Sequence, residues 1–180
     1  FATFSFHETK NIISGEGGLL VINDTQEAKR AEIIWEKGTN RSAFFRGEID
    51  KYGWVDIGSS FLPSDMIAAF LYGQLENLEI IQKKRIEVWD TYYECLKELS
   101  QKGYLKLPFL PEYATKNGHL FYVICNNSED RNNLLSHLKS KNIHATFHYL
   151  SLHKSEFYAS KYNGPELRNA DKYADCILRL

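Results

Sequence analysis

A long helical pattern of apolar residues in the middle of the chain constrains its fold more than any other feature. Pro63-Ser64-Asp65 marks a helix start, since proline suits the first turn and an acidic side chain favours the helix's amino end. From there to Gly103, apolar side chains recur at helical spacing: Ile67, Phe70, Leu71, Leu75, Leu78, Ile81, Ile86, Trp89, Tyr92, Tyr93, Leu96 and Leu99. The pattern exceeds ~25 residues and predicts one long bent helix or two in tandem. We expect its aromatic face to pack on a core.

Strand-like segments precede this helical region. Residues 1–6 alternate weakly and predict a strand, and residues 18–22 predict a second, buried strand. Asn23-Asp24-Thr25 is a helix-cap signal for a helix that ends at Gly38. Residues 38–62 are rich in glycine and aromatic side chains and follow no period. A loop of this length and composition is predicted to be ordered and to pack on a substrate or a partner subunit.

Strands and a helix are also expected after the helical region. Residues 119–125 and 143–150 predict strands on either side of a helix over 128–141, with Ser128 and Asp130 as its caps. This βαβ-like order and the elements before it indicate the α/β class. A shift in composition at the two prolines of residues 105–111 predicts a domain boundary near residue 106.

Composition excludes several classes of function. The formal net charge of −1 over 180 residues creates no global field for nucleic acid or an anionic membrane. No apolar run approaches the ~20 residues of a membrane span. Three dispersed cysteines without a Cys-x-x-Cys pair favour reduced thiols in a cytoplasmic protein. Both termini fall in apolar runs, so we expect a fragment of a longer chain.

Lys10 is the strongest candidate for chemistry. It follows the first predicted strand, in Ser5-Phe6-His7-Glu8-Thr9-Lys10-Asn11, and Gly15-Glu16-Gly17-Gly18 comes shortly after it. A lysine amine forms a Schiff base with a carbonyl, which is how proteins hold pyridoxal phosphate. The glycines predict a tight bend of the backbone there.

This motif resembles the lysine motif of the DegT/DnrJ/EryC1/StrS sugar aminotransferases, because its serine, aromatic, lysine, asparagine and glycines fall at that family's spacing. The resemblance implies the aspartate aminotransferase-like fold of pyridoxal-phosphate-dependent transferases. Residues 1–105 would be the C-terminal part of the large, cofactor-binding domain. Residues 106–180 would be most of the small α+β domain. The resemblance also implies a homodimer with a shared active site.

Further segments are similar to the branch of this family that makes dTDP-4-amino-4,6-dideoxygalactose. They are Gly38-Thr39-Asn40-Arg41-Ser42, Phe44-Phe45-Arg46-Gly47-Glu48, residues 51–60, residues 118–122 and residues 147–153. The implied reaction moves an amino group from glutamate to C4 of dTDP-4-keto-6-deoxyglucose, for cell-surface polysaccharide such as lipopolysaccharide.

The resemblance also assigns roles to particular residues. Lys10 is the implied catalytic and Schiff-base lysine, and Ser5 is the implied hydrogen-bond partner of the cofactor phosphate. Asn11 would shape the wall of the site. Ser60 stands where the family's opposite subunit offers an asparagine to the same phosphate, and a serine can still donate one hydrogen bond. The expected substrate contacts are His148, Tyr149, Arg41 and Arg46, where arginine suits a diphosphate. No metal site is expected.

Alternatives remain open. The relatives that are sugar dehydratases carry histidine in place of the lysine, which Lys10 argues against. A non-catalytic relative that binds a nucleotide sugar, or an aminotransferase for another nucleotide-linked keto sugar, is also compatible with the sequence. The family's aspartate for the pyridine nitrogen, its stacking aromatic and its glycine-rich phosphate turn would all lie before Phe1.

Overall fold

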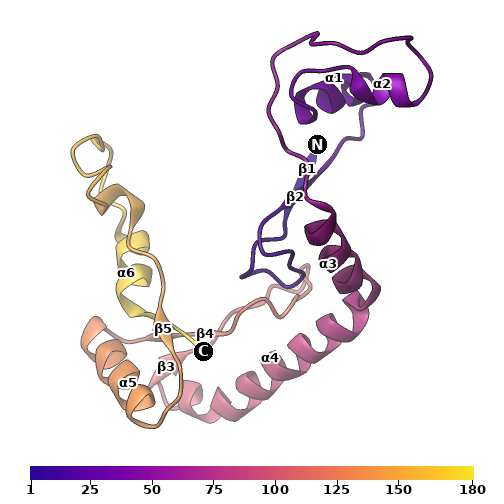
Figure 1. The fold of residues 1–180 in the computed structure, drawn as a ribbon. Helices are drawn as coiled ribbons and strands as arrows, with labels where there is room; N and C mark the ends of the chain where they lie inside the picture. The colour runs from indigo at the N-terminus through magenta and orange to yellow at the C-terminus, as the bar shows by residue number, and fades with distance from the viewer. The chain divides into compact units, whose positions relative to one another are not determined.

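The computed structural model describes residues 1–180, which form two compact units, residues 1–81 and residues 82–180 (Figure 1). The division falls in the first turn of the helix α4 (Leu78–Gln101). The domain boundary predicted near residue 106 stays a prediction. Each unit is described by itself below.

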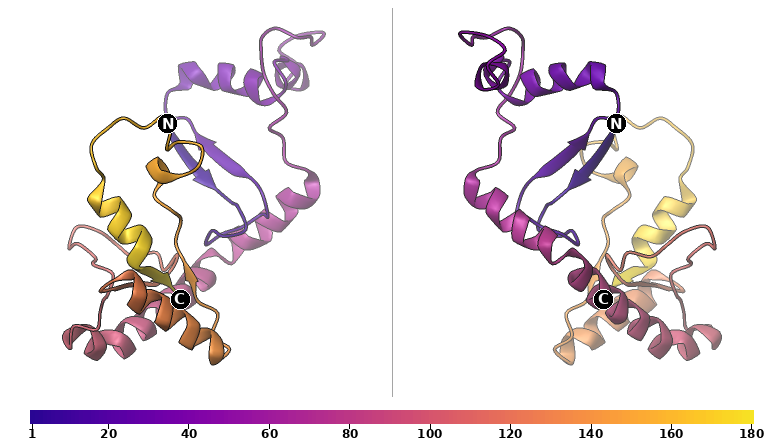
Figure 2. Two further views of the ribbon diagram at one scale, coloured as in Figure 1. Left: turned by 90° about the vertical axis from the view of Figure 1, so that its left-hand side faces the viewer. Right: turned by 90° about the vertical axis from the view of Figure 1, so that its right-hand side faces the viewer.

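The first unit begins with a hairpin and continues with helices. β1 (Ala2–Ser5) and β2 (Gly18–Val21) pair antiparallel, with Ala2 opposite Val21 and Ser5 opposite Gly18, and lie side by side in both views of Figure 2. The helices are α1 (Thr25–Trp35), α2 (Arg41–Phe45) and α3 (Asp65–Glu76). The side chain of Asp24 accepts a hydrogen bond from the amide of Gln26 and so caps α1, as the sequence predicts.

The long helical pattern resolves into two helices in tandem. Ser64 caps α3, since its hydroxyl accepts a hydrogen bond from the amide of Ile67, and Asn77 separates α3 from α4. The aromatic face of α4 packs on the core of the second unit through Trp89, Tyr92, Tyr93 and Leu96. The prediction of a core-packing face is therefore confirmed for α4.

The second unit is built on a four-stranded antiparallel sheet in the order β3-β4-β6-β5. Its elements are β3 (Leu105–Lys106), β4 (Tyr122–Cys125), α5 (Ser128–Ser140), β5 (Thr146–Phe147), η1 (Leu152–Lys154), α6 (Arg168–Cys176) and β6 (Ile177–Arg179). Because β6 pairs antiparallel with both β4 and β5, these two strands run parallel. The predicted βαβ unit is thus confirmed in a split form, with β6 inserted.

The structure corrects several local predictions. β2 is exposed rather than buried, because β1 is its only neighbour in a two-stranded sheet. Asn127, not Ser128, caps α5, since its side chain accepts from the amide of Asp130. The predicted strand 143–150 is reduced to β5. The short helix α2 lies in the predicted loop, and the sequence did not predict α6 or β6.

None of the helices has the length and apolar character that crossing a bilayer requires.

Candidate functional site

Lys10 lies in a loop that the two strands of the hairpin close at its base. Beyond β1 the backbone pairing continues, with the amide of Phe6 bonded to the carbonyl of Gly17 and that of Glu8 to the carbonyl of Gly15, both at 2.9 Å. The amide of Lys10 donates to the carbonyl of His7 at 2.9 Å, which makes a tight turn. The backbone of this half-buried lysine is therefore fixed by hydrogen bonds on both sides of the loop.

The glycine cluster and a buried serine shape the return of this loop. Ser14 is 2% exposed, and its hydroxyl donates to the carbonyl of Glu16 at 2.7 Å. Gly17 has a φ of +149°, and a Cβ there would lie 2.7 Å from the Ser14 hydroxyl oxygen. Only glycine fits this position without displacing Ser14. The sequence prediction of a tight, glycine-dependent bend is confirmed here.

The polar groups of this loop suit pyridoxal phosphate. Ser5 ends β1, and its exposed hydroxyl accepts a long, 3.4 Å hydrogen bond from the amide of His7. A hydroxyl in such a weak bond can turn to donate to a phosphate oxygen. Lys10 supplies the amine that the aldehyde of this cofactor requires. The polar groups of the loop therefore fit the cofactor at its reactive aldehyde and at the phosphate that anchors it.

The two candidate arginines are held by glutamates of the first unit. Arg46 donates from Nη1 and Nη2 to the two carboxylate oxygens of Glu32, at 2.6 and 3.0 Å, and from Nε to Glu48 at 2.7 Å. Hydrogen bonds to Glu32 and then to Glu48 raise the pKa of Arg46. The guanidinium of Arg41 lies 3.7 Å from Glu36 and 4.9 Å from the ring centre of Phe45. A diphosphate would compete with these carboxylates.

Ser60 lies beside Glu36, the buried glutamate that pairs with Arg41. It forms an isolated antiparallel bridge with Glu36, which is 8% exposed. The carboxylate of Glu36 also accepts a hydrogen bond from the hydroxyl of Ser42 at 2.7 Å. Ser60 is exposed, so its side chain is accessible for the predicted role at a partner's cofactor.

In the second unit, His148 and Tyr149 follow β5 directly. Their rings lie 5.1 Å apart at a tilt of 59°. Tyr149 is 79% exposed, whereas Nδ1 of His148 is buried without a hydrogen-bond partner. An exposed ring beside an imidazole suits the apolar faces and hydroxyls of a sugar.

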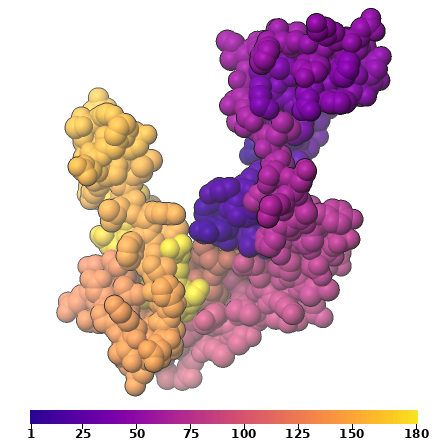
Figure 3. Space-filling model, viewed as in Figure 1, coloured from indigo at the N-terminus to yellow at the C-terminus, as the bar shows by residue number.

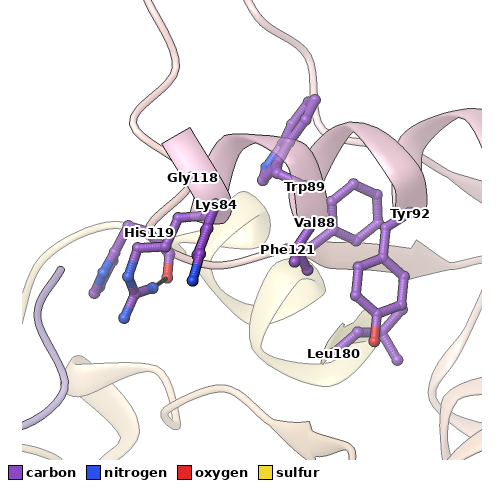
Figure 4. A pocket seen from close by; sticks show the side chains of 9 residues that line it. Lys84, Val88, Trp89, Tyr92, Gly118, His119, Phe121 and Leu180 are labelled. Carbon is purple, nitrogen blue, oxygen red and sulfur yellow. Dashed lines mark hydrogen bonds between the residues drawn. The ribbon is translucent and has the colours of Figure 1, made fainter. Parts of the chain in front are cut away.

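The second unit also contains a cavity of about 260 Å³ that the sequence did not predict (Figure 4). Its walls come from α4, from the segment before β4 and from the residue after β6: Lys84, Arg85, Val88, Trp89, Tyr92, Gly118, His119, Phe121 and Leu180. The rings of Trp89 and Tyr92 both lie 5.3 Å from that of Phe121. The sequence signal that could have indicated this cavity is the basic run Lys83-Lys84-Arg85 in the helix.

Comparison with known proteins supports the fold. The chain resembles DesV of S. venezuelae, solved in complex with a ketimine intermediate, at 29% identity and a TM-score of 0.82. It resembles Helicobacter pylori PseC, an aminotransferase involved in pseudoaminic acid biosynthesis, at 23% and 0.81. In both cases 99% of this chain is covered, but only 45% and 46% of the solved chains.

A curated relative is also similar over most of the chain. It is an uncharacterised protein of Methanocaldococcus jannaschii, 28% identical over 162 residues, which are 87% of this chain and 41% of the relative. The chain thus spans less than half the length of the proteins it matches.

The family assignment follows from the sequence model of one family, which matches residues 1–180. The solved relatives confirm the predicted aminotransferase fold, of which these residues are a part. Aminotransferases of this family depend on pyridoxal phosphate. The chain belongs to the DegT/DnrJ/EryC1/StrS aminotransferase family.

Proposed function

We propose that the protein is a pyridoxal-phosphate-dependent aminotransferase that moves an amino group from glutamate to C4 of dTDP-4-keto-6-deoxyglucose. The product would be dTDP-4-amino-4,6-dideoxygalactose, a precursor of cell-surface polysaccharide made in the cytoplasm. The observation that carries the proposal is the loop of Lys10, closed by backbone hydrogen bonds and preceded by the Ser5 hydroxyl. Family membership supports the reaction class, and the segments around residues 38–60 support the sugar.

The residues of the first unit would divide the work at the cofactor. When bound, pyridoxal phosphate supplies an electron sink for the substrate carbon. The Lys10 amine would hold the cofactor at its aldehyde and, once released, would take and return the proton at the substrate carbon. The Ser5 hydroxyl would donate to the phosphate, and Asn11 would line the wall of the site. Ser60 would donate to the phosphate of the partner subunit in a homodimer.

Four residues are the proposed contacts of the sugar nucleotide. Tyr149 and His148 present a ring and an imidazole to the sugar. Arg41 and Arg46 offer guanidinium groups to the diphosphate, in exchange for part of their bonding to Glu36 and Glu32. The contribution of each arginine to binding of the nucleotide sugar can be tested by its own Arg→Gln variant.

The test is borohydride trapping on the full-length protein after incubation with pyridoxal phosphate, followed by peptide mass mapping. We expect a pyridoxyl adduct on the peptide that contains Lys10, and its loss in Lys10→Ala. Lys37→Ala, an exposed lysine after α1, is the matched control and should leave the adduct in place. A folded protein without an adduct at Lys10 would overturn the aminotransferase assignment in favour of a non-catalytic nucleotide-sugar binder.

A second measurement addresses the substrate. The full-length enzyme is incubated with glutamate and a set of nucleotide-linked 4-keto sugars, and the aminated products are identified by mass spectrometry and NMR. Amination of dTDP-4-keto-6-deoxyglucose with the galactose configuration at C4 is expected. Exclusive turnover of another nucleotide-linked keto sugar would keep the reaction class and replace the substrate.

A further inference from the structure

A cluster of charged side chains ties η1 to α6 in the second unit. Oδ2 of Asp171, in the first turn of α6, lies 2.7 Å from Nζ of Lys154, and Oδ1 lies 3.3 Å from Nε2 of His153. The side chains of His153 and Asp171 are only 10% and 16% exposed. The hydrogen bond from Lys154 lowers the pKa of Asp171, so its carboxylate is charged at neutral pH. One carboxylate therefore joins two residues of η1 to one helix.

The imidazole of His153 also packs against an aromatic ring. Its ring lies 5.2 Å from that of Tyr162, at a tilt of 54°, and the Tyr162 hydroxyl donates to the carbonyl of Pro165 at 2.7 Å. These contacts join η1 to the segment that connects it with α6. In Figure 3 the residues around 151–167 stand out from the rest of the second unit, and residues 156–167 are exposed.

Along the chain, the segment that contains His148 and Tyr149 connects strand β5 of the sheet to η1, which contacts Asp171. On its amino side, β5 pairs with β6, Thr146 opposite Arg179 and Phe147 opposite Leu178. On its carboxyl side, η1 is bound to Asp171 of α6. Because β6 continues directly from α6, both anchors belong to one stretch of chain. The exposed Tyr149 and Leu150 contribute little burial of their own, being 79% and 76% exposed.

We infer that Asp171 is a positioning residue for sugar binding: by holding His153 and Lys154, it fixes the second end of the segment that presents His148 and Tyr149. This inference rests on the proposed function, since it takes those two residues as sugar contacts. With the carboxylate in place, the segment is held at both ends and pays little ordering entropy when the sugar binds. Without it, the carboxyl end of the segment loses its contacts with the Asp171 side chain, and more of its ordering must come from the ligand.

The experiment compares full-length Asp171→Asn with the wild-type protein, both loaded with pyridoxal phosphate. Asp171→Glu retains the carboxylate, and Asp175→Asn makes the same charge change at an exposed position of the same helix. Hydrogen exchange is followed by mass spectrometry on peptides that cover 146–154, and steady-state kinetics are measured for the nucleotide sugar and for glutamate.

In Asp171→Asn we expect faster exchange in 146–154 and a KM for the nucleotide sugar that rises about tenfold, while kcat and the KM for glutamate stay within about twofold. Asp171→Glu should restore most of the slow exchange in 146–154 and most of the low KM for the nucleotide sugar. Asp175→Asn should match the wild type. Unchanged exchange, or faster exchange with an unchanged sugar KM, would overturn the inference and leave the proposed function standing. Equal losses for sugar and glutamate would also overturn it, as the sign of a general structural defect. If the wild-type protein aminates no keto sugar, it is the proposed function that fails.

Discussion

Gly118 shows how one residue can control the approach of two segments. Its φ is +59°, and a Cβ there would lie 2.8 Å from the backbone carbonyl carbon of Arg85 in α4. Because the backbone of α4 cannot retreat as a flexible side chain can, the turn before β4 depends on glycine here. The turn is further tied to α4 by the hydrogen bond from Arg85 to the carbonyl of His119, at 3.2 Å.

Gly118→Ala should therefore lower the free energy of unfolding by roughly 2 kcal/mol or more, from left-handed strain and the clash with α4 together. Gly103→Ala is the control, since Gly103 has a φ of +80° but open space around its Cα. It should lose only the left-handed strain, about 1–2 kcal/mol. Urea denaturation of both variants measures the difference, and equal losses would show that the close approach to α4 carries no cost.

The three cysteines differ in what a thiol reagent can reach. Cys95 is exposed on α4, whereas Cys125 and Cys176 are each 5% exposed. Burial, with a smaller contribution from nearby Asp130, raises the pKa of Cys125 and so reduces its thiolate fraction. We expect a maleimide at neutral pH to modify Cys95 first, and the other two only under denaturing conditions. Peptide mapping after short labelling decides this, and early labelling of Cys125 would contradict it.

At the scale of elements, the structure explains which parts of the fold the sequence could predict. Helices α1 and α3 have a cap signal followed by several turns of periodic residues, so both their position and their start were predicted. At α5, Asn127 and Ser128 are adjacent and both have side chains that can cap a helix. The structure uses Asn127, one position before the predicted Ser128. β6 has three residues, too few for a period, and its place in the sheet depends on partners more than 30 residues away.

The candidate site likewise has parts that the sequence could predict and parts that it could not. The Lys10 loop could be predicted because its motif is contiguous and its glycine requirement is local. The pairing of Arg46 with Glu32, 14 residues earlier in the chain, could not, because it depends on how α1 and the turn after α2 meet. The same holds for Asp171, whose partners His153 and Lys154 lie in another element.

The Arg46 network makes a prediction about pH at this scale. Arg46 lowers the pKa of Glu48 through their hydrogen bond. A carboxyl with a lowered folded-state pKa stabilises the fold above its unfolded-state pKa, about 4.3, and this contribution is lost as the pH falls through the folded-state value. Arg46→Gln should therefore lower the Tm at pH 7, and the difference from wild type should shrink below about pH 4.

The effect of Arg46→Gln should also weaken in high salt, since the pairs are partly exposed. Arg168→Gln is the control, because Arg168 pairs with Glu166 at the open surface, with both side chains more than half exposed. Its Tm should stay close to wild type at all pH values. A pH-independent loss in Arg46→Gln would mean that packing of the arginine stem, rather than its charge, stabilises this region.

At the scale of the whole molecule, the two units differ in how much apolar surface they bury. The core of the second unit contains Leu105, Phe121, Val123 and Leu178, each 7% exposed or less. In the first unit Ile12 is the one buried hydrophobic residue, at 8%, while large apolar side chains of the hairpin remain accessible: Phe1, Phe4, Leu19 and Leu20.

The 180-residue chain produced alone should therefore show unequal protection from hydrogen exchange. Amides of β4 and β6 should exchange slowly, and those of β1 and β2 quickly, because local opening costs less where little apolar surface is buried. The chain should also bind the dye ANS, which the exposed side chains of the hairpin attract. Mass spectrometry on peptides from the two units tests this, and equal protection would contradict it.

The position of β6 has a consequence for how the protein is made. β6 lies between β4 and β5, yet it is the last of the four strands of this sheet to be synthesised. Until Ile177–Arg179 leaves the ribosome, β5 has no strand to pair with, and β4 has β3 alone. The sheet therefore closes only after its last strand has emerged, through contacts of high sequence separation, which slow folding. In a nascent chain paused before residue 177, the edges of β4 and β5 that pair with β6 would be open, a state prone to aggregation and to capture by chaperones.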